Sequence, residues 1–184
     1  MKTCKICEEQ FTPFYNSTQR VCSMECALID SKEKNLKKYY QETKKLKEKA
    51  KTKSDWMKEA QQAFNAYVRL RDRNRPCISC GEFHNGQYHA GHYRTTARAG
   101  HLRFHPFNNN RQCAPCNNHL SGNIIEYRKG LINKIGIKNV EWLENEESNY
   151  KFTIDDLQDI KKYYKEQLKI LQQQDSFERW TEGL

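Results

Sequence analysis

The sequence has no long hydrophobic run, and its apolar content is modest. Hydrophobic residues make up 36% and charged residues 30% of the 184 residues. No stretch is long enough to cross a membrane, and one extensive core is not expected at this size, so metal ions would supply extra stabilisation. A secretion signal, in which a charged segment precedes an apolar one, is also lacking. We therefore expect a cytoplasmic protein whose thiols stay reduced.

The eight cysteines fall into four close pairs. Close pairs are typical of zinc knuckles, and in a reducing compartment they do not indicate a disulfide framework. Two tetrahedral sites of four thiolates each would use every cysteine. We predict two structural Zn²⁺ sites, one with Cys4, Cys7, Cys22 and Cys26 and the other with Cys77, Cys80, Cys113 and Cys116.

Composition divides the chain into four segments. They are an N-terminal treble-clef-like zinc finger at 1–30, a basic linker helix at 31–55, a metal-binding core at 56–130 and a helical region at 131–184. The finger could bind DNA or a partner, or it could be a folding unit only. Residues 31–60 carry eleven lysines against five acidic residues, so the linker helix is either a spacer or an arm that contacts phosphates.

Several helix boundaries follow from sequence signals. A helix with apolar residues at helical spacing is predicted from Trp56, with Ser54 as its N-cap and Pro76 as the residue that stops it. An amphipathic helix is predicted to end at Gly136, followed by an acidic loop at 144–147. Thr153 is predicted to cap the last helix. The expected fold class is α+β and mainly helical.

The insert between the two CxxC pairs has an unusual composition. Thirty-two residues separate Cys80 from Cys113, and they hold five of the six histidines together with several arginines. Imidazoles suit metal ligation and guanidinium groups suit phosphate contacts, while a net charge of +9 suits a polyanion such as nucleic acid. A metal-dependent nuclease is the first hypothesis. The alternative is a non-catalytic zinc protein that binds DNA or a recombination protein.

The motifs of this region occur in a distinctive order: CxxC, HAGHYRTT, LRF, an asparagine, QCxxCN and SGN, within residues 56–127. This order resembles the HNH (ββα-metal) endonucleases and, within them, the NinG/Rap phage recombination nucleases. The resemblance extends less specifically to Trp142 and the final helix. It implies an HNH core and cleavage of branched DNA such as Holliday junctions and D-loops, although an HNH enzyme acting on linear duplex is a further alternative.

The same resemblance bears on partners and on location. It implies a protein encoded by a phage or prophage and acting in the cytoplasm of a bacterial host. Phage or host recombination proteins are candidate partners in addition to DNA. A homodimer would suit a branched substrate that is nearly symmetric.

Phosphodiester hydrolysis needs a base that activates water and a cation that stabilises the pentacovalent phosphate. His92 fits the base, because a neutral imidazole accepts a proton near pH 7. The resemblance implies that Asn108 braces the loop that carries this histidine, and Asn109 and Asn110 make the assignment uncertain by a residue. His84, His101 and His105 are predicted to be surface residues.

The catalytic metal ligands are expected just ahead of His92 and just after Cys116. We predict His89 and His119, with Asn117 as the rival for the second ligand; the NinG/Rap pattern usually has an acidic residue where His89 stands. Oxygen ligands suit Mg²⁺, whereas two imidazoles favour Mn²⁺, Ni²⁺, Co²⁺ or Zn²⁺. The catalytic ion is expected to be Mg²⁺ or Mn²⁺, with stronger activity in Mn²⁺. Four arginines are expected to position DNA, with at least one forming a structural pair instead: Arg94, Arg98, Arg103 and Arg111.

Overall fold

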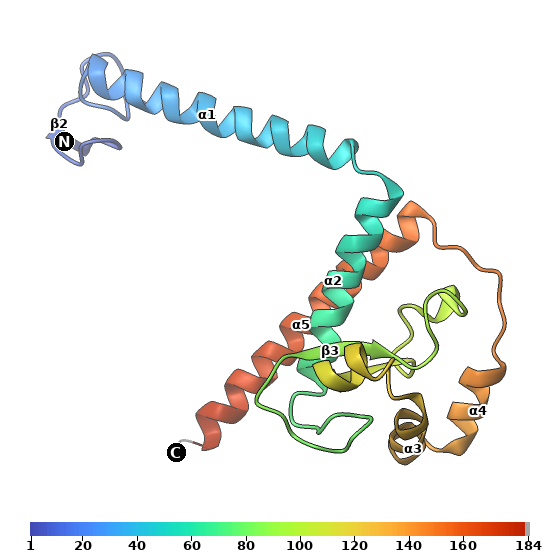
Figure 1. The fold of residues 1–184 in the computed structure, drawn as a ribbon. Coiled ribbons are helices and arrows are strands. Elements are labelled where there is room, and N and C mark those ends of the chain that lie inside the picture. Colours follow the sequence, from blue (N-terminus) through green and yellow to red (C-terminus); the bar gives the residue numbers. More distant parts are fainter. Residues whose placement is uncertain (183–184) are drawn as a thin grey trace. The chain divides into compact units, whose positions relative to one another are not determined.

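The computed structural model describes the backbone of residues 1–182 and the side chains of residues 1–176. It is mainly helical with two small antiparallel sheets, which confirms the expected α+β class (Figure 1). The chain forms two compact units, residues 1–51 and residues 52–184. The division into four segments by composition is finer than this and stays a prediction.

The N-terminal unit contains a short hairpin and one long helix. Strand β1 (Lys2–Thr3) pairs with β2 (Gln10–Phe11), and helix α1 runs over Met24–Lys49. The helix begins earlier than the basic linker predicted from residue 31, because the Ser23 hydroxyl accepts a hydrogen bond from the backbone N–H of Cys26 and so caps it. Only Cys26 and Asp30 of α1 are buried, so most of the helix is solvated.

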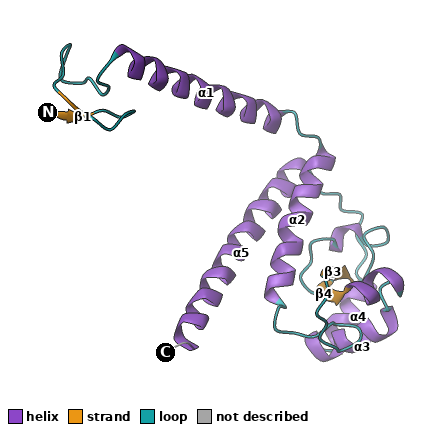
Figure 2. Ribbon diagram, turned by 60° about the vertical axis from the view of Figure 1, so that its left-hand side comes forward, coloured by secondary structure: helices purple, strands orange, loops and turns teal. Residues whose placement is uncertain are grey.

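The second unit is built on two long helices that pack side by side, α2 (Lys53–Arg71) and α5 (Ile154–Glu182) (Figures 1 and 2). Their shared core is rich in aromatic residues, and Phe64 and Leu157 are completely buried in it. The ring of Phe64 packs edge-to-face against that of Tyr164, with the ring centroids 4.6 Å apart. Edge-to-face geometry is the preferred arrangement of buried aromatic pairs. The apolar spacing that predicted a core face on the first of these helices is therefore confirmed.

Capping residues set where these two helices begin. The N-cap of α2 is Thr52, not the predicted Ser54, because Thr52 and Asp55 form a reciprocal capping box. The helix ends at Arg71, well before Pro76, so proline does not stop it. The predicted capping box of the last helix is confirmed: Thr153 Oγ1 accepts from the N–H of Asp156, whose carboxylate accepts from the N–H of Thr153.

A hairpin and two short helices complete the second unit. Strand β3 (Tyr88–His92) pairs antiparallel with β4 (Asn109–Cys113), and the π-helical turn η2 (Pro115–His119) follows β4 directly. The short turn η1 (Gly100–Leu102) lies in the loop between the strands. Helix α3 (Ile124–Ile135) ends at Gly136 as predicted, and α4 (Ile137–Asn145) extends into part of the predicted acidic loop. None of the described helices combines the length and apolar character needed to cross a bilayer.

Helix α3 contacts the first CxxC turn at very close range. A Cβ atom at Gly130 would lie well under 3.0 Å from the carbonyl oxygen of Ile78. That oxygen belongs to the backbone between Cys77 and Cys80 and has little room to move. The glycine is therefore required by the approach of the helix to the cysteine turn.

Candidate functional site

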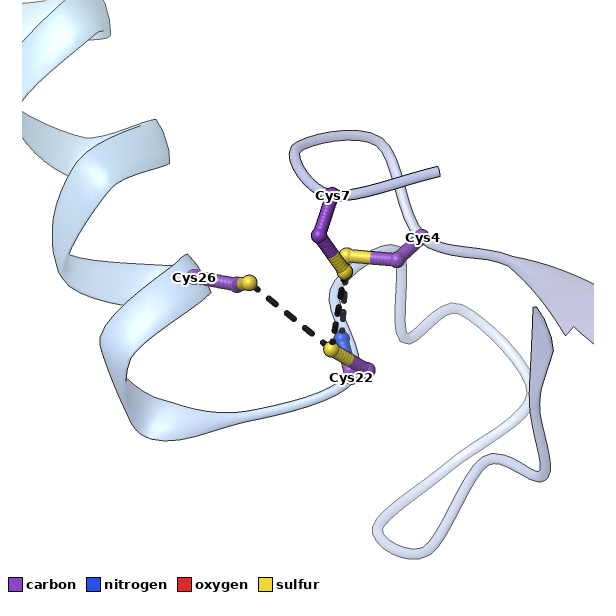
Figure 3. A group of neighbouring side chains, drawn as sticks. All are labelled: Cys4, Cys7, Cys22 and Cys26. Atoms are coloured by element: carbon purple, nitrogen blue, oxygen red, sulfur yellow. Dashed lines mark hydrogen bonds between the residues drawn. The ribbon is translucent and has the colours of Figure 1, made fainter. Parts of the chain in front are cut away.

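The N-terminal cluster brings together four cysteines from three places in the chain (Figure 3). Cys4 and Cys7 come from the turn after β1, Cys22 from the loop before α1 and Cys26 from the first turn of that helix. The Cys7 and Cys22 sulfurs are 3.4 Å apart, and the Cys22 and Cys26 sulfurs are 3.7 Å apart. Tetrahedral Zn²⁺ with Zn–S bonds of about 2.3 Å requires sulfur separations of roughly 3.8 Å.

The second cluster consists of Cys77, Cys80, Cys113 and Cys116, with all four sulfurs within 4.8 Å of one another. Cys113 is the last residue of β4, opposite Tyr88 in the hairpin, so this cluster is continuous with the strands that carry the histidines. The Cys80 and Cys113 sulfurs are 4.0 Å apart. Both tetra-cysteine clusters could hold zinc ions, as predicted, and all eight cysteines are free thiols.

Backbone amides stabilise thiolates in both clusters. Burial opposes ionisation of Cys4, but the backbone N–H groups of Cys7, Ile6 and Cys22 outweigh it and lower the pKa of Cys4 to about 6. Burial also opposes ionisation of Cys77, and backbone N–H groups including that of Cys113 again lower the pKa. The crowding of sulfurs acts the other way on Cys22, whose pKa is raised to about 12 by its hydrogen-bonded neighbours Cys7 and Cys4. Four thiols that meet at one point, with backbone N–H groups directed at them, fit zinc, because a bound cation favours the thiolate form.

His92 is held in one tautomer by a backbone carbonyl. Its Nε2 lies 3.0 Å from the carbonyl oxygen of Arg103. A carbonyl oxygen only accepts hydrogen bonds, so Nε2 carries the proton and the lone pair of the neutral ring is on Nδ1. Burial lowers the pKa of His92 below its usual 6.5, with the nearby Arg103 charge acting in the same direction. The ring is therefore neutral near pH 7 and able to accept a proton.

The three consecutive asparagines are buried and brace different segments. Asn108 accepts from the backbone N–H of Arg94 at 2.8 Å and donates to the carbonyls of Arg94 and Leu102 at 3.0 and 3.2 Å, so it clamps both ends of the loop after β3. Asn109 Nδ2 donates at 3.0 Å to the same Arg103 carbonyl that His92 contacts. Asn109 is thus a positioning residue for the histidine, in addition to Asn108.

Gly91 on β3 leaves room for the buried side chain of Gln112 on the neighbouring strand β4. A Cβ atom at Gly91 would clash with Oε1 of Gln112, the residue whose amide also bonds Ser79 Oγ at 2.7 Å and the Gly122 carbonyl at 2.6 Å. Gln112 therefore ties β4 to the first CxxC turn and to the segment before α3. The glycine between His89 and His92 is therefore a packing requirement.

His89 and His92 line one pocket of about 350 Å³, together with Asn117. The amide nitrogen of Asn117 lies 2.9 Å from Nδ1 of His89, so the two side chains meet directly. His119 is exposed at the end of η2 and is not among the residues that line this pocket. Asn117 therefore contacts His89 within the pocket, and His119 does not line it, while the ligand assignment itself stays a prediction.

The four arginines predicted to position DNA have different surroundings. Arg94 donates to the carbonyls of Leu143 and Glu146 at 2.8 and 2.5 Å, and so closes the end of α4. Arg111 donates to the carbonyls of Asp72, Arg73 and Arg75 and lies 3.4 Å above the centre of the Tyr88 ring. These two groups are occupied by structural contacts. Arg103 lines the histidine pocket, and Arg98 is exposed in the loop after β3.

Helix α2 contributes pocket residues that sequence reasoning missed. Gln61, Asn65 and Arg69 line the same pocket as His89 and His92 of the hairpin. Their spacing of four residues was the available signal, because it marks one polar face of a helix.

The remaining histidines are less uniform than predicted. His84 is exposed, as expected, but its Nε2 is 3.2 Å from the sulfur of Cys80. His101 has a buried Nε2 without a partner among the described residues. His105 packs against Trp142 with ring centroids 5.1 Å apart, and burial lowers its pKa. The prediction of plain surface residues is thus wrong for His101 and His105.

Comparison with known proteins gives a consistent result. The family model described as "Bacteriophage Lambda NinG protein" matches residues 1–175. "Protein ninG" of Escherichia phage 933W is 41% identical over 188 residues, covering 92% of this chain and 93% of that protein. "Protein ninG" of Escherichia phage lambda is 48% identical over 121 residues, covering 66% of this chain and 59% of that protein. No solved structure matches the chain significantly.

Proposed function

The chain belongs to the NinG family, and from this premise and the geometry of the histidine pocket we propose that it is a metal-dependent HNH-type endonuclease. The observation that carries the proposal is the environment of His92. This histidine lines an open pocket with its proton fixed on Nε2, its lone pair on Nδ1 and its pKa lowered by burial. These are the properties of a general base for water at neutral pH.

The proposed reaction is hydrolysis of one phosphodiester bond. Nδ1 of His92 takes a proton from water as the water oxygen bonds to phosphorus. The bond from phosphorus to the 3′-oxygen breaks, and this oxygen takes a proton from solvent, which leaves a 5′-phosphate and a 3′-hydroxyl. Asn108 and Asn109 keep the loop and the Arg103 carbonyl in place, so the orientation of the imidazole is set before DNA binds.

The pocket also offers donors for a catalytic cation. His89 and Asn117 contact each other, so an imidazole nitrogen and an amide oxygen are available within one ligand shell once the amide is turned. Both donors are neutral, which fits a weakly bound Mg²⁺ or Mn²⁺ whose shell is completed by water and phosphate. When bound, the ion would supply positive charge for the pentacovalent phosphate and the leaving oxygen.

The proposed substrate is branched DNA, including Holliday junctions and D-loops, in the cytoplasm of a bacterial host. The motifs at residues 89–123 resemble those of the NinG/Rap nucleases, and this resemblance supports a branched substrate. The net charge of +9 supports DNA in general, and a second copy of the chain or recombination proteins would be its partners.

The substitution His92→Ala tests the proposal. We expect cleavage of a four-way junction to fall by about 10²- to 10⁴-fold, since general-base catalysis contributes factors of this size. Affinity for the junction, zinc content and melting temperature should change little. Binding is followed by fluorescence anisotropy and cleavage by denaturing gels with Mg²⁺ and with Mn²⁺.

Two outcomes would contradict the proposal in different ways. A wild-type protein that binds DNA but never nicks it with any divalent metal would be the non-catalytic zinc protein. Equal cleavage of a four-way junction and a matched linear duplex would leave an HNH nuclease but remove the preference for branches.

A further inference from the structure

We propose that helix α2 provides a binding subsite for a DNA backbone phosphate at the mouth of the histidine pocket, with Arg69 as its contact residue and Gln61 as the residue that positions Arg103. The identity of the anion rests on the proposed nuclease function. The subsite itself rests on the arrangement of α2 against the hairpin.

The polar face of α2 is directed at the histidines. Gln61, Asn65 and Arg69 are spaced four residues apart, so they lie one above the other on the helix. All three line the pocket that His92 lines. The buried residues Ala60, Phe64 and Val68 precede each of them by one position, so the helix packs into the core along the neighbouring face.

The charges that line this pocket have one sign. It contains two guanidinium groups, Arg69 and Arg103, and no carboxylate among its lining residues in the described part of the chain. Arg69 is exposed in the last turn of α2 and forms no ion pair with any described residue. A free guanidinium beside a second one, with no competing acid, is suited to a phosphate and binds it through paired N–H donors.

Gln61 connects the two sides of the pocket. Its Oε1 accepts from the Arg103 guanidinium at 3.2 Å, and its Nε2 donates to Asn65 Oδ1 at 2.8 Å. The backbone carbonyl of Arg103 holds His92. Arg103 therefore has two roles: its backbone carbonyl orients the imidazole of His92, and its guanidinium is available to bind phosphate. The hydrogen bond from this guanidinium to Gln61 on α2 sets its direction.

The substitution Arg69→Ala tests the subsite. We expect the affinity for a four-way junction to fall about tenfold, the amount that corresponds to about 1.4 kcal/mol. The slope of log affinity against log salt should decrease in magnitude by about one, because one phosphate contact is lost. Arg69→Lys should retain the salt slope. Binding is measured by anisotropy with zinc-loaded protein and without added Mg²⁺ or Mn²⁺.

Lys162→Ala is the matched control. Lys162 is an exposed cation on α5 that does not line the pocket, so its loss tests net charge alone. An Arg69→Ala variant that matches this control in both affinity and salt slope would overturn the subsite.

Gln61→Ala leaves the charge unchanged and should raise KM more than it lowers kcat.

Failure of this inference is distinguishable from failure of the proposed function. If the wild type never cuts DNA but Arg69→Ala still weakens binding beyond the control, the subsite stands as a DNA contact and the nuclease is rejected. If the wild type cuts and Arg69→Ala behaves like the control, the nuclease stands and the subsite is rejected.

Discussion

The imidazole of His92 has its proton on Nε2, and burial disfavours its charged, doubly protonated form. Because burial lowers its pKa below the usual 6.5, the ring is protonated only at pH values under that point and is neutral above it. A base is active when neutral, so cleavage should rise with pH, reach half of its plateau below pH 6.5 and then stay level toward pH 8 or so. Single-turnover rates across this range measure the profile. A midpoint at or above 6.5 would contradict the assignment of His92.

Two side chains compete for the place of second metal ligand beside His89. Asn117 contacts His89 at 2.9 Å, whereas His119 is exposed outside the pocket. Asn117→Ala should therefore raise the Mn²⁺ concentration needed for half-maximal cleavage about tenfold, and His119→Ala should change it less than about twofold. Each variant is titrated with Mn²⁺ at saturating DNA. The reverse order of effects would restore His119 as the ligand.

Whether the role of a single residue could be predicted from the sequence depends on which groups its side chain contacts in the fold. The Asn108 clamp was implied by resemblance, and the structure shows the contacts. At least one of the four arginines was expected to form a structural contact, but which ones do so was not foreseeable, because the partners of Arg94 and Arg111 are backbone carbonyls of 143–146 and 72–75. No sequence pattern indicates which backbone carbonyl groups lack a main-chain hydrogen-bond donor in the fold. Predicting DNA contacts from arginines alone therefore overstates their number.

The contact between α3 and the first CxxC turn depends on the absence of one Cβ atom. Gly130→Ala should destabilise the second unit by about 1 to 3 kcal/mol, since overpacking a close contact has costs of this order. The oxygen that it meets, on Ile78, belongs to the backbone of a cysteine turn. Thermal melting and zinc retention under a chelator measure the effect.

Gly86→Ala is the control for that substitution. A Cβ atom at Gly86 meets nothing within 4 Å, and its backbone is not in the left-handed region. Its melting temperature should equal that of the wild type within error. Equal destabilisation by the two substitutions would show that the contact with Ile78 does not account for the effect of Gly130→Ala.

Long helices were easier to predict than short ones. The apolar periodicity of α2 and α5 was evident, and the Thr153 cap gave the start of α5. Helix α4 was missed because nine residues offer only two buried positions, Val140 and Leu143, which is too short a pattern to separate from a loop. The strands β3 and β4 are polar in sequence, and their pairing is set by the cysteine cluster and buried amides that only the fold brings together.

The two units each contain a complete cysteine cluster, so their stabilities should be separable. Zinc is expected at two ions per chain by metal analysis. Cys22→Ser and Cys113→Ser should each reduce this to one, since three thiolates hold zinc far less tightly than four. Only Cys113 ends a strand of the hairpin that carries His89 and His92. Cys113→Ser should therefore abolish cleavage and lower the main melting transition, whereas Cys22→Ser should leave both nearly unchanged. Loss of cleavage in Cys22→Ser, with a normal melting transition for residues 52–184, would show that catalysis needs both units.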